Sequence, residues 1–160
     1  MRESIGGAWL FGIVVTFIVL FSSFLAYSVS YTKAFNVKNM IIDYIETSEG
    51  YTSYTASSDI YNANLSNDPT VEGKSFNLIK NVGYNYSLTQ NIVCEKGYNK
   101  PGGYCLVKVC PDGSSVSNVH YKVTTYIALE IPIVSVVVKI PISGETRSIY
   151  HDNTGYACTP

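Results

Sequence analysis

Charged side chains are absent from the first part of the chain and scarce in the rest. No Asp, Glu, Lys, Arg or His occurs from Ser4 to Thr32, and only 14% of the 160 residues are charged, with a net charge of -1. Nucleic acids attract proteins through basic patches and runs of Lys and Arg, and the sequence has neither. The composition therefore excludes nucleic acid as a partner.

The uncharged run Ser4 to Thr32 is long enough to cross a membrane, because about 20 helical residues span a hydrocarbon layer of about 30 Å. Three interpretations compete: a retained anchor, a cleaved secretory signal and a buried core helix. A core helix keeps a polar stripe, which this run lacks. A signal has a shorter apolar core, of roughly 7–15 residues, and only Ala26 and Ser28 resemble a cleavage site here. A retained anchor is favoured, with the lipid bilayer as partner.

Residues for catalysis are also few. The chain has two histidines, His120 and His151, and neither lies in a motif with a serine or cysteine nucleophile. No glycine-rich phosphate loop follows a strand and no His-Glu-x-x-His is present. We therefore expect neither an enzyme nor a bound cofactor or metal. A membrane-tethered enzyme would require the fold to bring His151, Asp152 and a distant group into one cleft.

The four cysteines all follow the uncharged run. An even number of cysteines in a small domain behind a membrane segment is typical of disulfides in an oxidising compartment, so the domain is expected to be extracytoplasmic. Zinc would need closer Cys or His spacings. Four cysteines allow three pairings, of which we prefer Cys94–Cys105 with Cys110–Cys158.

The first of these pairings follows from a predicted hairpin. The glycine-rich segment 97–103 contains Lys100-Pro101-Gly102-Gly103, which is typical of a hairpin loop between strands at 88–94 and 104–110. Folding the two arms about this loop places Cys94 opposite Cys105.

Helical periodicity continues beyond the uncharged run. From Lys33 to Glu49 no proline or glycine intervenes, and apolar side chains recur at intervals of three and four residues. These are Phe35, Val37, Met40, Ile41, Tyr44 and Ile45. We predict one continuous helix over 1–49, ended by Gly50, and a domain over 50–160 that begins with a polar loop at 51–74, with a short helix near 59–64.

The last third of the chain predicts an antiparallel sheet. Apolar and polar residues alternate from Val119 to Ile131, the period of a half-buried strand. Pro132 ends this strand, a second apolar set follows to Ile142, and a short strand covers 145–150. The segment 131–142 is too short and too interrupted to be a second membrane span. The fold class is therefore α+β, a long transmembrane helix continuing as an amphipathic helix and packed on a small disulfide-stapled antiparallel sheet.

This arrangement resembles the pilin-like proteins of type IV filament systems, and in particular the TadE-like minor pilins of tight-adherence pili. The resemblance lies in the short polar head, the uncharged helix continuing through Lys33-Ala34-Phe35-Asn36-Val37-Lys38-Asn39, and the closing sheet. In the sheet it covers Tyr121 to Tyr150, with Ile131-Pro132-Ile133, Ile140-Pro141-Ile142 and Gly144-Glu145-Thr146.

The resemblance implies a structural subunit of a surface filament or secretion apparatus, with pilus assembly proteins and other pilin-like subunits as partners of the N-terminal helix. Prepilins carry a glutamate within the apolar run, whereas here the early acid is Glu3, before the run. If Glu3 has the same role, it acts at the membrane interface. Residues expected to serve insertion or assembly are Glu3, Gly6, Gly7, Ala8 and Gly12, since Ala8 and Gly12 have the small-x-x-x-small spacing of close helix pairs.

A second hypothesis is a single-pass, membrane-anchored extracellular binding or adhesion module. The chain has 14 tyrosines, and tyrosine favours interfaces because it combines apolar area with a polar tip. Gene neighbours distinguish the two hypotheses, because a filament subunit is expected beside a secretion ATPase and an integral platform protein.

Overall fold

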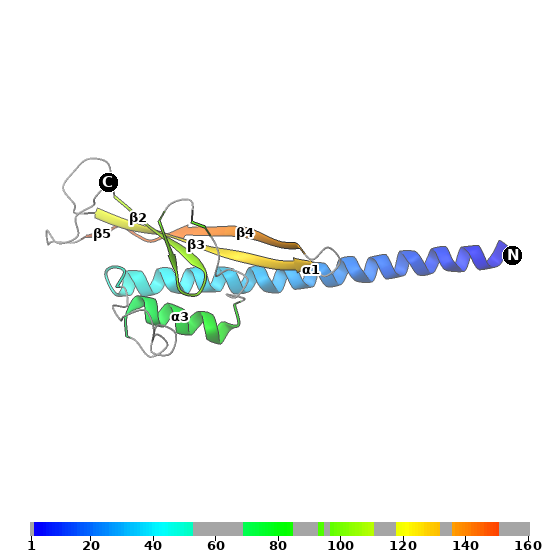
Figure 1. The fold of residues 1–160 in the computed structure, drawn as a ribbon, viewed down its shortest axis with the longest axis horizontal. Helices are drawn as coiled ribbons and strands as arrows, with labels where there is room; N and C mark the ends of the chain where they lie inside the picture. The colour runs from blue at the N-terminus through cyan, green and yellow to red at the C-terminus, as the bar shows by residue number, and fades with distance from the viewer. Residues whose placement is uncertain are drawn as a thin grey trace.

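A single helix runs through almost a third of the chain and extends far beyond the rest of the molecule (Figure 1). In the computed structural model, α1 covers Arg2–Thr47 and is followed by α3 (Val71–Val82) and a five-stranded antiparallel sheet. The structure describes residues 2–52, 69–84, 93–94, 97–110, 118–131 and 136–150. The fold is thus α+β with a long N-terminal apolar helix, as the sequence predicts.

The C-terminal end of α1 lies close to the predicted position. The helix ends at Thr47, two residues before the expected Glu49. The amide of Gly50 donates to the carbonyl of Ile45 at 3.0 Å, which satisfies one of the last carbonyls of the helix. Glu49 adopts a left-handed conformation (φ 51°), so the chain reverses before entering the domain.

The C-terminal part of α1 lies between the sheet and α3 (Figure 1). Ala34, Val37, Ile41 and Ile45 are fully buried, at spacings of three and four residues that define one face of the helix. Burying each Val or Ile side chain stabilises the fold by about 1.5–3 kcal/mol. This third of the helix is therefore part of the core of the head, the name used below for the sheet, α3 and residues 33–47 of α1.

Two residues expected on the buried face of α1 are not buried. Phe35 is 39% exposed and Met40 is 42% exposed, whereas Lys38 is 8% exposed. Lys38 is buried because its aliphatic stem packs over Gly144: a β-carbon there would lie 3.1 Å from Lys38 Cδ and 2.9 Å from Ile42 Cδ1. The Lys38 ammonium lies 4.3 Å from the centre of the Phe35 ring.

The sheet has the order β1-β2-β3-β4, and β5 also pairs with β3. Its strands are Tyr98–Lys100 (β1), Tyr104–Val109 (β2), Asn118–Ile131 (β3), Val136–Glu145 (β4) and Ile149–Tyr150 (β5). Along β3, the side chains of Val119, Tyr121, Val123, Thr125 and Ile127 are buried, and those between them are partly exposed. The alternation predicted for this strand is confirmed over the residues whose side chains the structure describes. Of the final strand predicted at 145–150, only Ile149–Tyr150 forms β5, because Glu145 belongs to β4 and residues 146–148 are in no strand.

Helix α3 was not expected, and Val71–Lys74 lies in the segment predicted to be a loop. Thr70 caps its N-terminus by accepting a hydrogen bond from the amide of Gly73, and Gly83 ends it in the left-handed conformation. The apolar side chains of Val71, Phe76 and Ile79 are buried. A threonine cap, an apolar spacing of three to five residues and a closing glycine are the signals that could have identified this helix. The short helix expected near 59–64 lies outside the described residues.

The hairpin lies later in the sequence than predicted. Its first strand is β1, within the segment expected to be the loop, and Asn99 is the cross-strand partner of Cys105. The turn consists of Pro101, Gly102 and Gly103. The expected strand at 88–94 is wrong at its described end, since Val93 and Cys94 are not in a strand.

The structure nevertheless joins Cys94 to Cys105 by a disulfide, with Cα atoms 5.8 Å apart. This bond fixes the segment before β1 against β2. No cysteine in the described part of the chain is a free thiol. The pairing of Cys110 with Cys158 stays a prediction, because Cys158 lies outside the described residues.

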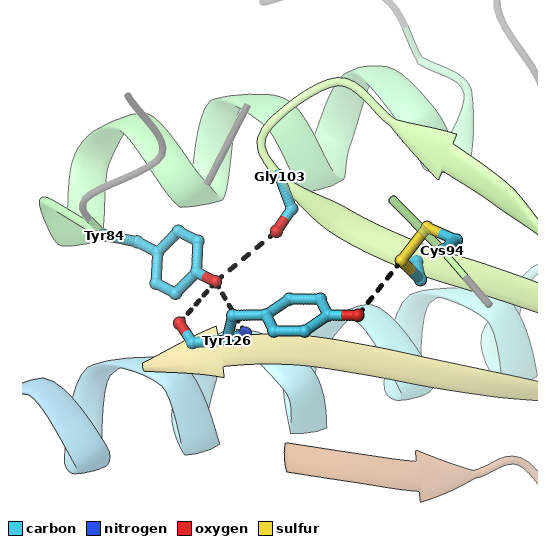
Figure 2. Close-up of a disulfide and its surroundings, with 5 residues drawn as sticks. Tyr84, Cys94, Gly103 and Tyr126 are labelled. Atoms are coloured by element: carbon cyan, nitrogen blue, oxygen red, sulfur yellow. Dashed lines mark hydrogen bonds between the residues drawn. A yellow bond between two sulfur atoms is a disulfide. The ribbon is translucent and has the colours of Figure 1, made fainter. Parts of the chain in front are cut away.

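The hydroxyl of Tyr84 bonds to the backbone of β3 just beyond the point where the pairing of β2 with β3 ends (Figure 2). It donates to the carbonyl of Tyr126 at 2.7 Å and accepts from the amide of the same residue at 2.8 Å. The backbone amide and carbonyl of Tyr126 therefore both face away from β4. The residue of β4 that lies opposite Tyr126 is Pro141. Because this is a non-hydrogen-bonded position, the missing amide of the proline costs no ladder bond.

Replacing Tyr84 by Phe removes this hydroxyl and leaves two backbone groups of Tyr126 without it. We expect the free energy of unfolding to fall by about 1–3 kcal/mol, the cost of unsatisfied buried polar groups. The measurement is urea unfolding of the detergent-solubilised chain. Tyr98→Phe is the matched control, because Tyr98 is 75% exposed. Equal midpoints for the two variants would contradict this role of Tyr84.

Candidate membrane and assembly segment

The N-terminal half of α1 presents apolar side chains in every direction. From Trp9 to Val29 fourteen large apolar residues are between 40% and 73% exposed, and none of the most apolar 18-residue window is buried. A helix that is apolar all round needs an apolar environment, because water-exposed helices carry a polar face. By length and composition α1 is able to cross a membrane. We call residues 6–30 the apolar segment.

Three hydroxyl groups in the apolar segment, those of Thr16, Ser22 and Ser23, bond to the helix itself. Thr16 Oγ1 donates to the carbonyl of Gly12 at 2.9 Å, and Ser22 and Ser23 both donate to the carbonyl of Val19. Thr32, just beyond it, donates to the carbonyl of Ser28. A hydroxyl costs much less in a lipid environment when it is hydrogen-bonded within its own helix. These polar side chains are therefore compatible with a membrane span.

A groove of small residues runs along one side of the apolar segment. Ala8, Gly12 and Thr16 follow one another at four-residue intervals, and the larger side chains of Trp9, Ile13, Phe17 and Leu20 border them. A β-carbon at Gly12 would have no neighbour within 4 Å. The groove leaves room for a second helix to approach closely.

The other residues expected to serve assembly lie at the start of the same helix. Gly6 and Gly7 are exposed, and a β-carbon at either would meet nothing within 4 Å. The backbone of Glu3 is helical, but its side chain lies outside the described part of the structure. The structure thus places the five predicted residues on one helix without showing what they contact.

Aromatic residues mark the transition from the apolar segment to the head. The rings of Tyr27 and Tyr31 are 6.3 Å apart, and those of Tyr31 and Phe35 are 6.1 Å apart. Tyrosines are enriched where membrane helices meet water, since their rings are amphipathic. The first charged side chain after the run, Lys33, lies between the last two members of this row.

Lys33 fixes the end of α3 to α1. Its ammonium donates to the carbonyl of Gly83 at 3.2 Å, beyond the last turn of α3. A cation at a helix C-terminus is favourable because of the partial negative charge there. This contact could not be predicted from the sequence, because its two residues are fifty positions apart.

At the far end of the head, an ion pair joins α1 to the segment before β5. Glu46 accepts hydrogen bonds from the amide of Arg147 at 2.8 Å and from Arg147 Nε at 2.9 Å. Lys33 and Glu46 thus join residues 33–47 of α1 to the rest of the head, one near each end of this stretch of helix. The apolar segment continues from a rigid junction.

The outer face of the sheet, opposite α1, is hollowed and carries mixed side chains. It is lined by apolar residues of β2, by His120, Lys122 and Tyr126 of β3, and by residues of β4. Lys122 and Glu145 form an exposed ion pair there at 3.8 Å. In the described part of the chain, no group of three or more His, Cys, Asp or Glu side chains is placed to hold a metal ion. His151 and Asp152 lie outside the described residues.

Comparison with known proteins finds no matching family model, no matching curated protein and no matching solved structure.

Two arginines in the middle of the apolar segment, Val15→Arg with Ile18→Arg, test whether it resides in lipid. Each arginine at the centre of a span costs about 2.5–3.5 kcal/mol, so the pair offsets most of the insertion energy. We expect the variant to be released from membranes by alkaline extraction, while the unchanged chain remains in the pellet. Val93→Arg is the control, because Val93 is 88% exposed in the head. Retention of the double variant would contradict a membrane span.

Proposed function

We propose that this protein is a membrane-anchored, pilin-like structural subunit of the TadE-like kind, which takes part in assembling a surface filament or secretion apparatus. The apolar segment spans the membrane once, and the head lies on the extracytoplasmic side. The disulfide between Cys94 and Cys105 supports this orientation, because such bonds persist in oxidising compartments.

One observation carries the proposal: the helix that is apolar all round is continuous with the helix that forms the core of the head. A flexible tether would be sufficient for a simple anchor. A rigid junction instead fixes the direction of the head relative to the apolar segment, which a regular assembly of subunits requires.

The chemistry of the apolar segment suits a change of surroundings. Association of apolar helices is driven by close packing and not by a loss of contact with water. Such a helix can therefore leave lipid for a bundle of related helices without a change in its side chains. The groove at Ala8, Gly12 and Thr16 is the part of the segment where a neighbouring helix packs most closely.

The hollow outer face of the sheet favours a second candidate function, an anchored binding or adhesion module. That face combines apolar residues with Lys122, His120 and the Tyr126 ring, which suits a polar ligand or another protein. Binding would then depend on the head and not on the groove of α1.

Filling the groove separates these two functions. Gly12→Ile places a branched side chain where a second helix would pack, so we expect loss of the chain from surface filaments sheared from the source cells. Membrane insertion should be unchanged, because isoleucine is strongly apolar. Val14→Ile, on another side of the helix, is the matched control.

The proposal is contradicted if the unchanged chain stays a dispersed membrane monomer in cells that build filaments. Normal assembly of the Gly12→Ile variant would reject the groove as the packing surface. The anchored binding module would gain support if both variants behaved like the unchanged chain while substitutions at Lys122 abolished surface binding.

A further inference from the structure

Two contacts fix how β3 is aligned with α1. Thr125 Oγ1 donates to the carbonyl of Ala34 at 3.1 Å, and Arg147, adjacent to the residue that pairs with Tyr121, bonds to Glu46. Along α1 the two contacts are twelve residues apart, which is about 18 Å of helix. Along β3 they are about five residues apart in the reverse order, which is about 17 Å of strand. The agreement shows that the strand and the helix run side by side in opposite directions.

The same alignment locates the end of the β3–β4 pair. From Thr125 to Ile131 the strand continues for six residues, about 20 Å, which equals about 13 residues of helix. Ile131 therefore lies at about the level of Phe21 on α1. Figure 1 shows β3 and β4 extending along α1 towards its N-terminus, beyond the other strands.

At this level α1 is already in its apolar segment. Phe21, Phe24 and Leu25 are between 50% and 64% exposed. The aromatic row that begins at Tyr27 lies closer to the head. If the row marks the surface of the membrane, the end of the β3–β4 pair lies on the membrane side of that surface, by a few residues of helix.

The composition of this end suits a lipid interface. No charged residue occurs between Glu130 and Lys139. The described backbone pairs Ile131 with Val136 at the end of the ribbon, and the next two pairs are Glu130 with Val137 and Leu129 with Val138. Pairing with β2 stops at Thr124, and among the described residues no other strand pairs with this end, so it is a two-stranded ribbon with open edges. Open edges exclude deep insertion, because their backbone groups need water or lipid head groups.

We propose that the end of this ribbon, Ile131 with Val136–Val138, between the charged residues Glu130 and Lys139, inserts shallowly into the outer leaflet beside α1 as a second membrane contact. A depth of about 5–10 Å, at the boundary of head groups and acyl chains, is typical of interfacial segments. Two contacts fix the tilt of the head on the membrane, which a single helix does not. The inference rests on the membrane anchoring in the proposed function, but not on filament assembly.

Fluorescence quenching by brominated lipid tests the inference in the full-length chain. Trp9 is the only tryptophan, so Trp9→Phe provides a background for one new probe. Val137→Trp places it at the ribbon end, and Lys139→Trp, two residues further from that end on the same face, is a second probe. Tyr150→Trp is the control, because Tyr150 is 67% exposed in β5, at the opposite end of the sheet.

The proteins are reconstituted in phosphatidylcholine vesicles brominated near the glycerol end of the acyl chains. We expect about a twofold loss of emission for Val137→Trp, a smaller loss for Lys139→Trp and none for Tyr150→Trp. The losses should persist when the protein is diluted with lipid. Unfolding midpoints equal to that of the Trp9→Phe chain establish that each variant is folded.

The inference would be overturned if the Val137→Trp variant, like the Tyr150→Trp variant, gave the same emission in brominated vesicles as in plain vesicles. Quenching that appears only on dilution would also overturn it, since a second copy would then cover the ribbon end in the assembled state. The unchanged chain separates this failure from a failure of anchoring: quenching of Trp9 without quenching of either ribbon probe rejects the ribbon contact alone.

Discussion

The packing of α1 residues 34–45 between the sheet and α3 is the constraint on which the rest of the structure depends. Ala34, Val37, Ile41 and Ile45 are fully buried, and the sheet and α3 are held on different sides of the same helix. Each fully buried Val or Ile contributes about 1.5–3 kcal/mol, which is large compared with a typical net stability of about 5–15 kcal/mol. Without this helix the sheet and α3 would expose their apolar faces.

Because α1 continues without a break into the apolar segment, one helix joins this segment to the head. Lys33 and Glu46 reinforce the junction near its two ends, through Gly83 and Arg147. No glycine or proline interrupts α1 between Gly12 and Thr47. The continuous helix therefore sets the direction of the head relative to the apolar segment.

The long regular elements of the fold could be predicted from the sequence, because the spacing of apolar residues along each element determines them. The continuous helix and the alternation along β3 are of this kind. The disulfide between Cys94 and Cys105 was also predicted, although for the wrong reason. In the structure Asn99 is the cross-strand partner of Cys105, and Cys94 reaches Cys105 from a segment outside the strands.

The contacts that fix the head depend on residues distant in sequence and could not be predicted. Lys38 is buried because a glycine more than a hundred positions later leaves room for its stem. Tyr84 is buried with its hydroxyl bonded to the backbone amide and carbonyl of Tyr126, forty-two positions later. α3 was missed because its apolar face is narrow and includes Glu72, which is 1% exposed and lies 3.9 Å from Lys100.

Removal of successive parts of α1 tests most directly whether one helix serves both as apolar segment and as core. A chain beginning at Ser30 keeps every fully buried residue of the helix, whereas one beginning at Ser48 keeps none. We predict that the first is soluble and unfolds cooperatively in urea, and that the second does not fold. Cooperative unfolding of both chains with the same midpoint would contradict the account, because the head would then fold without the helix.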